Sequence, residues 1–206
     1  MLYYMNLTEM AQASQLHYTV KNKFKKRDKA LYENKFNGYK IDPSSDENVM
    51  GMYHNDKQHL HINHRGTSKP MDLLSDRLKL AGLERFDPQY NARRKHTKQM
   101  IKSYPDAKHV SLSGHSLAGD TVLQALHKSP SLAKHIDEVK IFNPFNVSKY
   151  EKDKDLHKKV EIHRTKSDLV SIIKQPYKTV VHNKDKNQQP LDAHGLHNFI
   201  NDSPNN

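Results

Sequence analysis

The chain of 206 residues contains no cysteine. This absence excludes disulfide bonds, catalysis by a thiolate and metal sites with sulfur ligands. Because disulfides are typical of oxidising compartments, a chain without them suggests that it is not built for one, without excluding secretion, and the cytoplasm is the default expectation.

Segments that would carry the chain to or through a membrane are lacking as well. The stretch Met1–Asn6 does not place a basic segment before a long apolar one, as a signal peptide would. No apolar run reaches the roughly 20 residues that a membrane-spanning helix needs. We therefore expect a protein that is soluble or in peripheral contact with a membrane surface.

Acidic residues are few relative to basic ones, with 23 Asp and Glu against 34 Lys and Arg and a formal net charge of +11. Such an excess attracts polyanions. The lysines are scattered and no nucleic-acid motif accompanies them, so we interpret the charge as a solvated basic surface and expect no nucleic-acid partner. Peripheral contact with an anionic membrane surface is the alternative that agrees better with the motifs described below.

The pattern of apolar residues predicts alternating strands and helices. A capping signal at Asn6 starts an N-terminal helix, and the basic stretch Lys21–Lys29 is either the exposed end of that helix or a membrane-facing arm. Strands over 49–53 and 60–64 form a hairpin. The other predicted helices span 72–82, 90–103 and 117–128, and the other predicted strands span 109–113, 139–142, 160–163 and 179–181.

This order of elements defines the fold class. Strands separated by helices imply an α/β fold, with a mostly parallel central sheet and helices on both faces. The chain length fits one domain. We expect residues 1–40 to form a basic helical segment packed on or flanking the core, residues 41–200 to form the sheet-and-helix domain, and the polar residues 201–206 to form a frayed tail.

A serine lies where a predicted strand meets a predicted helix. The six residues GHSLAG at 114–119 follow directly on the strand over 109–113 and open the helix over 117–128. A serine on such a sharp turn projects its hydroxyl out of the sheet, and the helix N-terminus beside it supplies unpaired N–H groups. The pattern is typical of a hydrolase nucleophile, which makes Ser116 the candidate.

A serine hydroxyl becomes a good nucleophile only beside a histidine base that an acid orients. In sheet-and-helix hydrolases the chain order is Ser, then Asp or Glu, then His. Asp168 follows the strand over 160–163, and His194 and His197 follow the last strand. We take Asp168 as the acid, although a turn or cap residue is the alternative reading, and we prefer His194 as the base, with His197 second.

The charge that develops on the substrate carbonyl oxygen requires hydrogen-bond donors. One is expected from the residue after the nucleophile and another from the loop after an earlier strand. Leu117 supplies the first N–H. Gly66 follows the strand over 60–64 and lets the backbone turn, so that the N–H and hydroxyl of Thr67 point at the site.

The 15 histidines raise the alternative of a metal site. His59 and His61 share one face of a strand, and His194 and His197 have a spacing that suits one face of a helix. No acidic partner follows at a recognisable ligand spacing. We therefore expect no metal site, and the serine chemistry requires no organic cofactor.

The chain resembles the lipase class 3 family of α/β hydrolases, which includes fungal-type triacylglycerol lipases and plant phospholipases A1. The resemblance covers about Val49 to Phe199. Its matching segments are HRGT at 64–67, Asp72 with Asp76, SGHSLAG at 113–119, DLV at 168–170 and AH at 193–194. It implies an α/β-hydrolase fold in which the nucleophile is Ser116, the acid Asp168, the base His194, and the oxyanion donors Thr67 and Leu117.

Two positions depart from the family pattern. Ala118 stands where the family usually has glycine, and one added methyl group is expected to be tolerated there. His64 replaces the usual aromatic residue, which bears on the shape of the acyl pocket.

These observations predict a serine hydrolase of carboxylic esters, a lipase or phospholipase-like enzyme that cleaves lipid esters through an acyl-enzyme. The alternative is a catalytically inactive hydrolase-fold protein that binds an anionic membrane or nucleic acid. Hydrolysis of an ester distinguishes the two.

Overall fold

A computed structural model of the chain describes residues 4–21, 23–66, 88–144, 154–166, 168, 177–182 and 194–200. The predicted helix over 72–82 and the predicted tail over 201–206 lie outside these residues. So do Thr67, Asp72 and Asp76.

The described residues form a seven-stranded sheet whose strands are neighbours in chain order. The strands are β1 (Tyr39–Ile41), β2 (Val49–His54), β3 (His59–His64), β4 (His109–His115), β5 (Glu138–Phe142), β6 (Val160–Thr165) and β7 (Lys178–His182). β1, β2 and β3 pair antiparallel, whereas β3 to β7 run parallel. The antiparallel part is the predicted hairpin extended by β1, a three-residue strand that the sequence pattern did not indicate.

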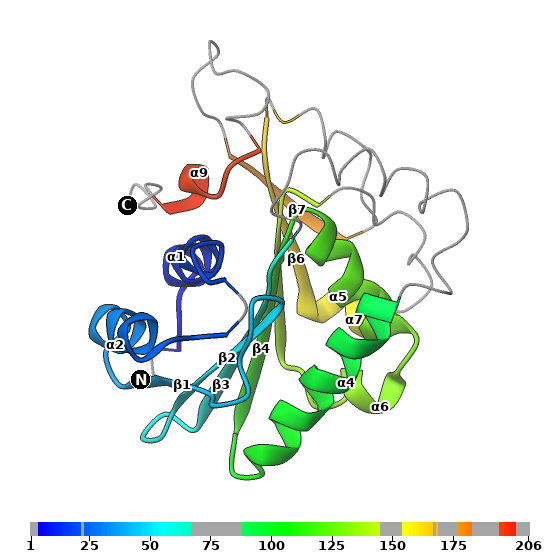
Figure 1. Cartoon of the computed structure of the whole chain (residues 1–206). Coiled ribbons are helices and arrows are strands. Elements are labelled where there is room, and N and C mark those ends of the chain that lie inside the picture. The colour runs from blue at the N-terminus through cyan, green and yellow to red at the C-terminus, as the bar shows by residue number, and fades with distance from the viewer. Residues whose placement is uncertain are drawn as a thin grey trace.

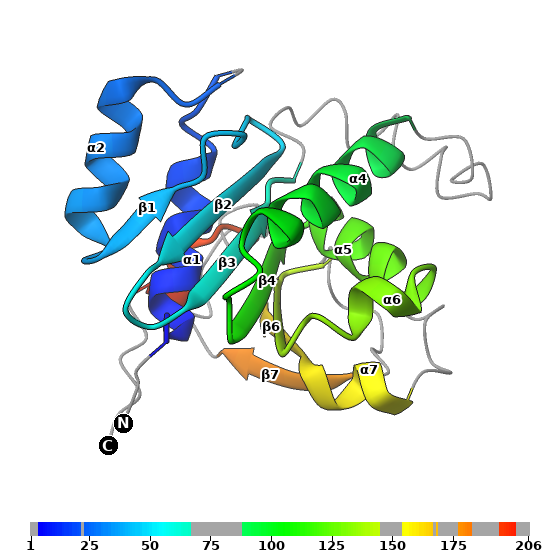
Figure 2. The same cartoon turned by 90° about the horizontal axis from the view of Figure 1, so that it is seen from below.

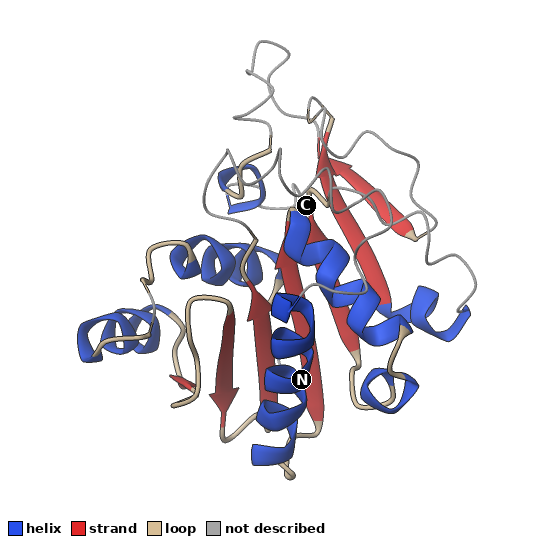
Figure 3. Cartoon of the chain, turned by 45° about the vertical axis from the view of Figure 1, so that its right-hand side comes forward, coloured by secondary structure: helices blue, strands red, loops and turns tan. Residues whose placement is uncertain are grey.

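Helices cover both faces of the sheet (Figure 3). They are α1 (Leu7–His17), α2 (Lys26–Lys35), α4 (Pro88–Ser103), α5 (Leu117–His127), α6 (Pro130–Ala133), α7 (Lys154–Lys159) and α9 (His197–Ile200). α4 to α7 lie on one side of the sheet, and α1, α2 and α9 lie on the other (Figure 1). The predicted mostly parallel sheet with helices on both faces is confirmed. No helix in the described part of the chain has the length and apolar character of a membrane span.

The order of the strands explains this division of the helices. Parallel strands that are neighbours in both sequence and space are joined by right-handed connections, and connections of one hand carry their helices to one face. The opposite face is left for segments outside these connections. It is covered by the N-terminal helices and α9, and Figure 2 shows α1 across the sheet from α4.

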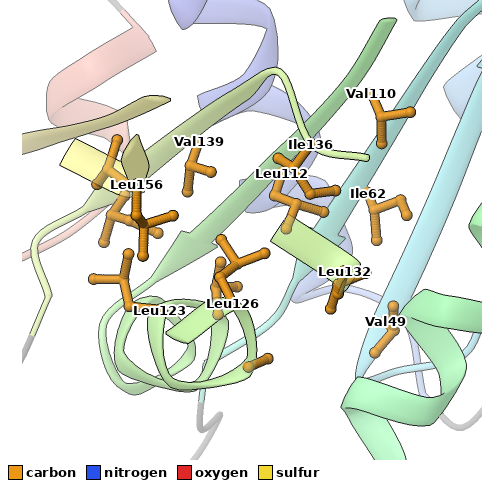
Figure 4. Packing of buried hydrophobic residues seen from close by; sticks show 14 of the residues in the cluster. Val49, Ile62, Val110, Leu112, Leu123, Leu126, Leu132, Ile136, Val139 and Leu156 are labelled. Carbon is orange, nitrogen blue, oxygen red and sulfur yellow. The ribbon is translucent and has the colours of Figure 1, made fainter. Parts of the chain in front are cut away.

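The face under α4 to α7 holds an apolar core (Figure 4). Ile62, Leu112 and Val139 extend from three neighbouring strands and are buried together with Leu123 and Leu126 of α5. Each fully buried side chain of this size contributes about 1.5–3 kcal/mol. This core fixes α5 against the sheet and thereby sets the start of α5, where the serine lies.

On the opposite face, α1 begins where the sequence predicts. The side-chain oxygen of Asn6 accepts a hydrogen bond from the backbone N–H of Glu9 at 2.9 Å, and the Glu9 carboxylate accepts from the backbone N–H of Asn6 at 2.8 Å. This reciprocal pair satisfies two donors that a helix start leaves unpaired. α1 then packs against β3, β4, β5 and α9.

The basic stretch 21–29 is not the end of α1, so that part of the prediction is wrong. α1 ends at His17, and the stretch leads into a separate helix, α2, that begins at Lys26. The guanidinium of Arg65 donates hydrogen bonds to the carbonyls of His17 and Val20, at 3.4 and 2.7 Å. The carbonyl of His17 also accepts from the N–H of Val20 at 3.2 Å. The Arg65 side chain and this single turn satisfy the end of α1, and the chain leaves the helix there.

Candidate active site

Ser116 is the single residue between the end of β4 and the start of α5. Its φ of 58° and ψ of −129° place it in a backbone region that residues other than glycine rarely adopt. Its N–H donates to the carbonyl of Phe142 at 2.9 Å, which holds the turn against β5. The turn is therefore the strained strand-to-helix junction that the sequence predicts.

Two glycines make room for this turn. A Cβ atom on Gly114 would lie 3.0 Å from the backbone of Ala118, and one on Gly119 would lie 2.4 Å from Cγ2 of Ile141. Ala118, which lies between these glycines in the first turn of α5, is itself fully buried. The first turn of α5 is thus packed tightly onto β4 and β5, and only glycine fits at position 119.

The structure brings together three of the predicted residues. Nε2 of His194 lies 2.9 Å from Oγ of Ser116, and Nδ1 of His194 lies 3.0 Å from Oδ2 of Asp168. Asp168 is completely buried, and its N–H donates to the carbonyl of Thr165 at 3.1 Å. An ionised Asp168 can only accept, so Nδ1 of His194 carries the proton and Nε2 is free to accept the Ser116 proton.

His194 and His197 differ in position. His194 lies before α9 and contacts Ser116, whereas His197 is the first residue of α9. The backbone carbonyl of His194 accepts two hydrogen bonds, from Nε2 of His115 at 2.8 Å and from Nδ2 of Asn143 at 3.0 Å. The ring of His194 is therefore held through its own main chain as well as through Asp168.

Asn143 is a site residue that sequence reasoning missed. It is fully buried at the end of β5 with a positive φ of 42°. Its side chain donates to the carbonyl of His194 and accepts from the N–H of Thr165 at 2.9 Å, so it ties His194 to the end of β6 near Asp168. The available signal was a polar residue at the end of a buried strand, at the same edge of the sheet as Ser116.

The predicted oxyanion donors are only partly described. Leu117 is the first residue of α5, so its N–H belongs to the first turn, which has no acceptor within the helix. Gly66 lies against the serine turn, because a Cβ there would lie 2.6 Å from the carbonyl oxygen of His115 and 3.5 Å from Cβ of Ser116. Thr67, which follows it, lies outside the described residues.

His64 is buried under α4. Its Nε2 lies 2.9 Å from the Thr97 hydroxyl, and burial, with a smaller contribution from Arg93, holds its pKa well below the usual value. Its ring is neutral at pH 7 and joins β3 to α4.

Within the described residues, no group of three or more histidine, aspartate or glutamate side chains is arranged to hold a metal ion. His59 and His61, which the sequence placed on one face of a strand, both lie 2.8 Å from the hydroxyl of Ser111.

A cavity of about 810 Å³ opens between α4, α6 and the start of β4. Its lining residues include Ile101, Tyr104, Val110 and Leu132, with Lys102 among its charged members. Because β4 runs from the cavity to the serine turn, the cavity lies at the opposite end of that strand from Ser116, about 20 Å away.

Comparison with known proteins shows the fold. The chain is similar to a deletion mutant of the Rhizomucor miehei lipase in its propeptide complex, at a TM-score of 0.55 and 13% identity, over 94% of this chain and 74% of that one. It is similar to lipase II from Rhizopus niveus, at 0.54 and 16%, over 81% and 73%. It is also similar to a lipase from Rhizopus microsporus var. chinensis, at 0.52 and 16%, over 87% and 74%. Neither protein-family models nor curated protein sequences give a match. The chain has a lipase-like α/β-hydrolase fold.

Proposed function

We propose that the protein is a serine hydrolase that cleaves carboxylic esters of lipids through an acyl-enzyme intermediate. The observation that carries the proposal is the continuous hydrogen-bonded chain from buried Asp168 through His194 to Ser116. The positive φ of Ser116 adds support, because strain of this kind is retained where a surrounding structure enforces it for function. Together these features agree with the roles of acid, base and nucleophile.

In the proposed first half-reaction, Oγ of Ser116 attacks the ester carbonyl carbon while Nε2 of His194 takes the hydroxyl proton. Asp168 stabilises the resulting imidazolium. The tetrahedral oxyanion accepts hydrogen bonds from the N–H of Leu117 and from Thr67. When the carbon–oxygen bond to the leaving alcohol breaks, His194 returns its proton to that alcohol, and the acyl group stays on Ser116.

In the second half-reaction, water takes the place of the serine as nucleophile. His194 accepts a proton from the water, the carbonyl–Oγ bond breaks, and the proton passes to Ser116 as the carboxylic acid leaves. The groups of the chain and one water balance both halves, so the scheme invokes no metal and no organic cofactor.

The choice of lipid esters within the ester class has two supports. The three similar solved structures named above, with TM-scores above 0.5, are lipases. The net charge of +11 would favour approach to an anionic lipid surface, with peripheral contact rather than insertion.

A fluorophosphonate probe tests the nucleophile directly. We expect the wild type to be labelled and to hydrolyse a nitrophenyl ester, and Ser116→Ala to lose both properties. Ser131→Ala, which removes an exposed hydroxyl on α6, serves as the matched control and should behave like the wild type. Equal labelling of Ser116→Ala and the wild type would refute the assignment.

The competing function is that of a catalytically inactive binding protein. A folded wild type that neither reacts with the probe nor hydrolyses esters, but binds anionic vesicles or DNA in a salt-sensitive way, would support that function instead.

A further inference from the structure

The last turn of α1 reaches the serine turn through Tyr18. Tyr18 follows directly on α1, and its hydroxyl lies 2.9 Å from Nδ1 of His115, the residue before Ser116. The two rings meet edge to face, with centroids 5.7 Å apart and planes at 79°. His115 and Ser116 are both largely buried, so this contact is shielded from water.

The hydrogen bonds around His115 determine where its proton lies. Its Nε2 faces the carbonyl of His194 at 2.8 Å, and a carbonyl can only accept, so Nε2 carries the proton. Burial lowers the pKa of His115 to about 3, so the ring is neutral at pH 7 and Nδ1 has no proton. Nδ1 must therefore accept, and Tyr18 donates its hydroxyl proton to it.

The oxygen of Tyr18 has a second neighbour, the backbone of Gly66 at the end of β3. Burial raises the pKa of Tyr18 to about 12, and the backbone of Gly66 beside the phenolic oxygen opposes this rise. A Cβ atom on Gly66 would lie 2.6 Å from this oxygen, so the backbone after β3 and the phenol are in close contact. The Tyr18 hydroxyl thus contacts both Gly66, which leads to Thr67, and His115, whose ring bonds the backbone carbonyl of His194.

Arg65 fixes the end of α1 so that Tyr18 stays in this place. It donates to the carbonyls of His17 and Val20, and its guanidinium carbon lies 5.9 Å from the centre of the Tyr18 ring. Arg65 also pairs with Glu47 at 3.3 Å. The buried guanidinium of Arg65 therefore fixes the end of α1 and, with it, the position of the Tyr18 side chain.

We propose that Tyr18 is a positioning residue of the active site, whose hydroxyl selects the Nε2–H form of His115 and thereby holds the backbone of His194, while it also packs against Gly66. The inference rests on the proposed function, since it assigns Tyr18 a role in placing the base His194 and the segment after β3 that leads to the oxyanion donor Thr67. Without the phenolic proton, His115 can adopt the Nδ1–H form. Its unprotonated Nε2 then faces the carbonyl oxygen of His194, and the hydrogen bond between these two atoms is lost.

Tyr18→Phe tests the role, with Tyr32→Phe as the matched control. Tyr32 lies in α2, is buried, and donates its hydroxyl to the carbonyl of Ala13 at 3.3 Å, outside the network around Ser116. Each variant loses one hydroxyl from the N-terminal region. Measured well below both unfolding temperatures, Tyr18→Phe should lower kcat and the rate of Ser116 labelling about tenfold with little change in KM. Tyr32→Phe should retain wild-type values.

A spectroscopic measurement separates this inference from the proposed function. The ring ¹⁵N spectrum should show His115 as the Nε2–H form in the wild type and as a mixture of forms in Tyr18→Phe, whether or not the protein is an enzyme. If the wild type neither labels nor hydrolyses esters, the proposed function fails while this spectrum still tests the hydrogen bond. An Nδ1–H form in the wild type, an unchanged spectrum in Tyr18→Phe, labelling of Tyr18→Phe at the wild-type rate, or an equal loss in Tyr32→Phe would each overturn the inference.

Discussion

At the scale of single residues, the buried carboxylate of Asp168 determines which ring nitrogen of His194 carries the proton. As an acceptor it keeps the proton on Nδ1 of His194, 3.0 Å away. An amide in its place can donate to Nδ1, and the ring proton then moves to Nε2, where it faces Ser116 and blocks proton abstraction.

We therefore expect Asp168→Asn to lower kcat for a nitrophenyl ester by about 10³-fold to 10⁴-fold with little change in KM. Asp106→Asn, at an exposed position in the turn before β4, is the control and should keep full activity. A loss smaller than tenfold in Asp168→Asn would show that this carboxylate does not orient the base.

The two histidines near the C-terminal end make a second prediction at this scale. Because the ring nitrogen 2.9 Å from Oγ of Ser116 belongs to His194, His194→Ala should lose ester hydrolysis and probe labelling. His197→Ala should keep most of both. If His194→Ala were as active as the wild type, the role of base would pass to His197.

At the scale of an element, α1 depends on its capping box. Asn6→Ala removes the side-chain acceptor for the Glu9 N–H, a change that costs about 1 kcal/mol of unfolding free energy at a helix start. For a chain of this size, the loss corresponds to a fall of about 2–4 °C in Tm. Thermal unfolding followed by circular dichroism measures it.

Asn6→Asp is the companion variant, because an aspartate oxygen can accept the same hydrogen bond and suits the positive end of the helix dipole. Its Tm should equal or exceed that of the wild type. Equal Tm values for Asn6→Ala and the wild type would mean that the cap contributes nothing to the folded chain.

At the scale of the whole molecule, the interior contains a set of neutral histidines. Burial, the largest cause in each case, lowers the pKa of His59 to about 2, of His17 and His115 to about 3, and of His61 and His163 to about 4. Burial also holds the pKa of His64 well below the usual value. In the unfolded chain each of these rings binds a proton near pH 6.5.

These histidines make the fold sensitive to acid. Below about pH 6.5 the unfolded chain binds protons that the folded chain does not, so the free energy of unfolding falls with falling pH by up to about 1.4 kcal/mol per pH unit for each histidine. The fall continues for each ring until the pH reaches its folded pKa. Six such rings would remove the 5–15 kcal/mol of a typical domain within about two pH units.

Urea unfolding at several pH values between 7.5 and 5.5 measures this dependence. The wild type should lose stability steeply below pH 6.5, and His61→Gln, which removes one buried ring that bonds Ser111, should show a shallower slope. The quantity compared is the change in the free energy of unfolding per pH unit, not the free energy itself, because the substitution also disturbs packing. A wild-type stability independent of pH over this range would contradict the assignment of neutral buried rings.

The sequence by itself determined the elements whose signals are local. The alternation of apolar residues in β3 and β4, the short apolar run of β2, the capping box at Asn6 and the glycines around Ser116 each involve neighbours within a few residues, and the structure agrees with them. The chain order of Ser116, Asp168 and His194 also came from the sequence, as did the α/β fold class.

Only the tertiary structure decided which side chains meet. The bond from Ser116 to His194 joins residues 78 positions apart, and the bond from Tyr18 to His115 joins residues 97 apart. No local pattern encodes such contacts, because they depend on how parallel strands place their carboxyl ends at one edge and which helix covers each face. The hydrogen bonds of Asn143 and those from Arg65 to the carbonyls of His17 and Val20 are long-range in the same way.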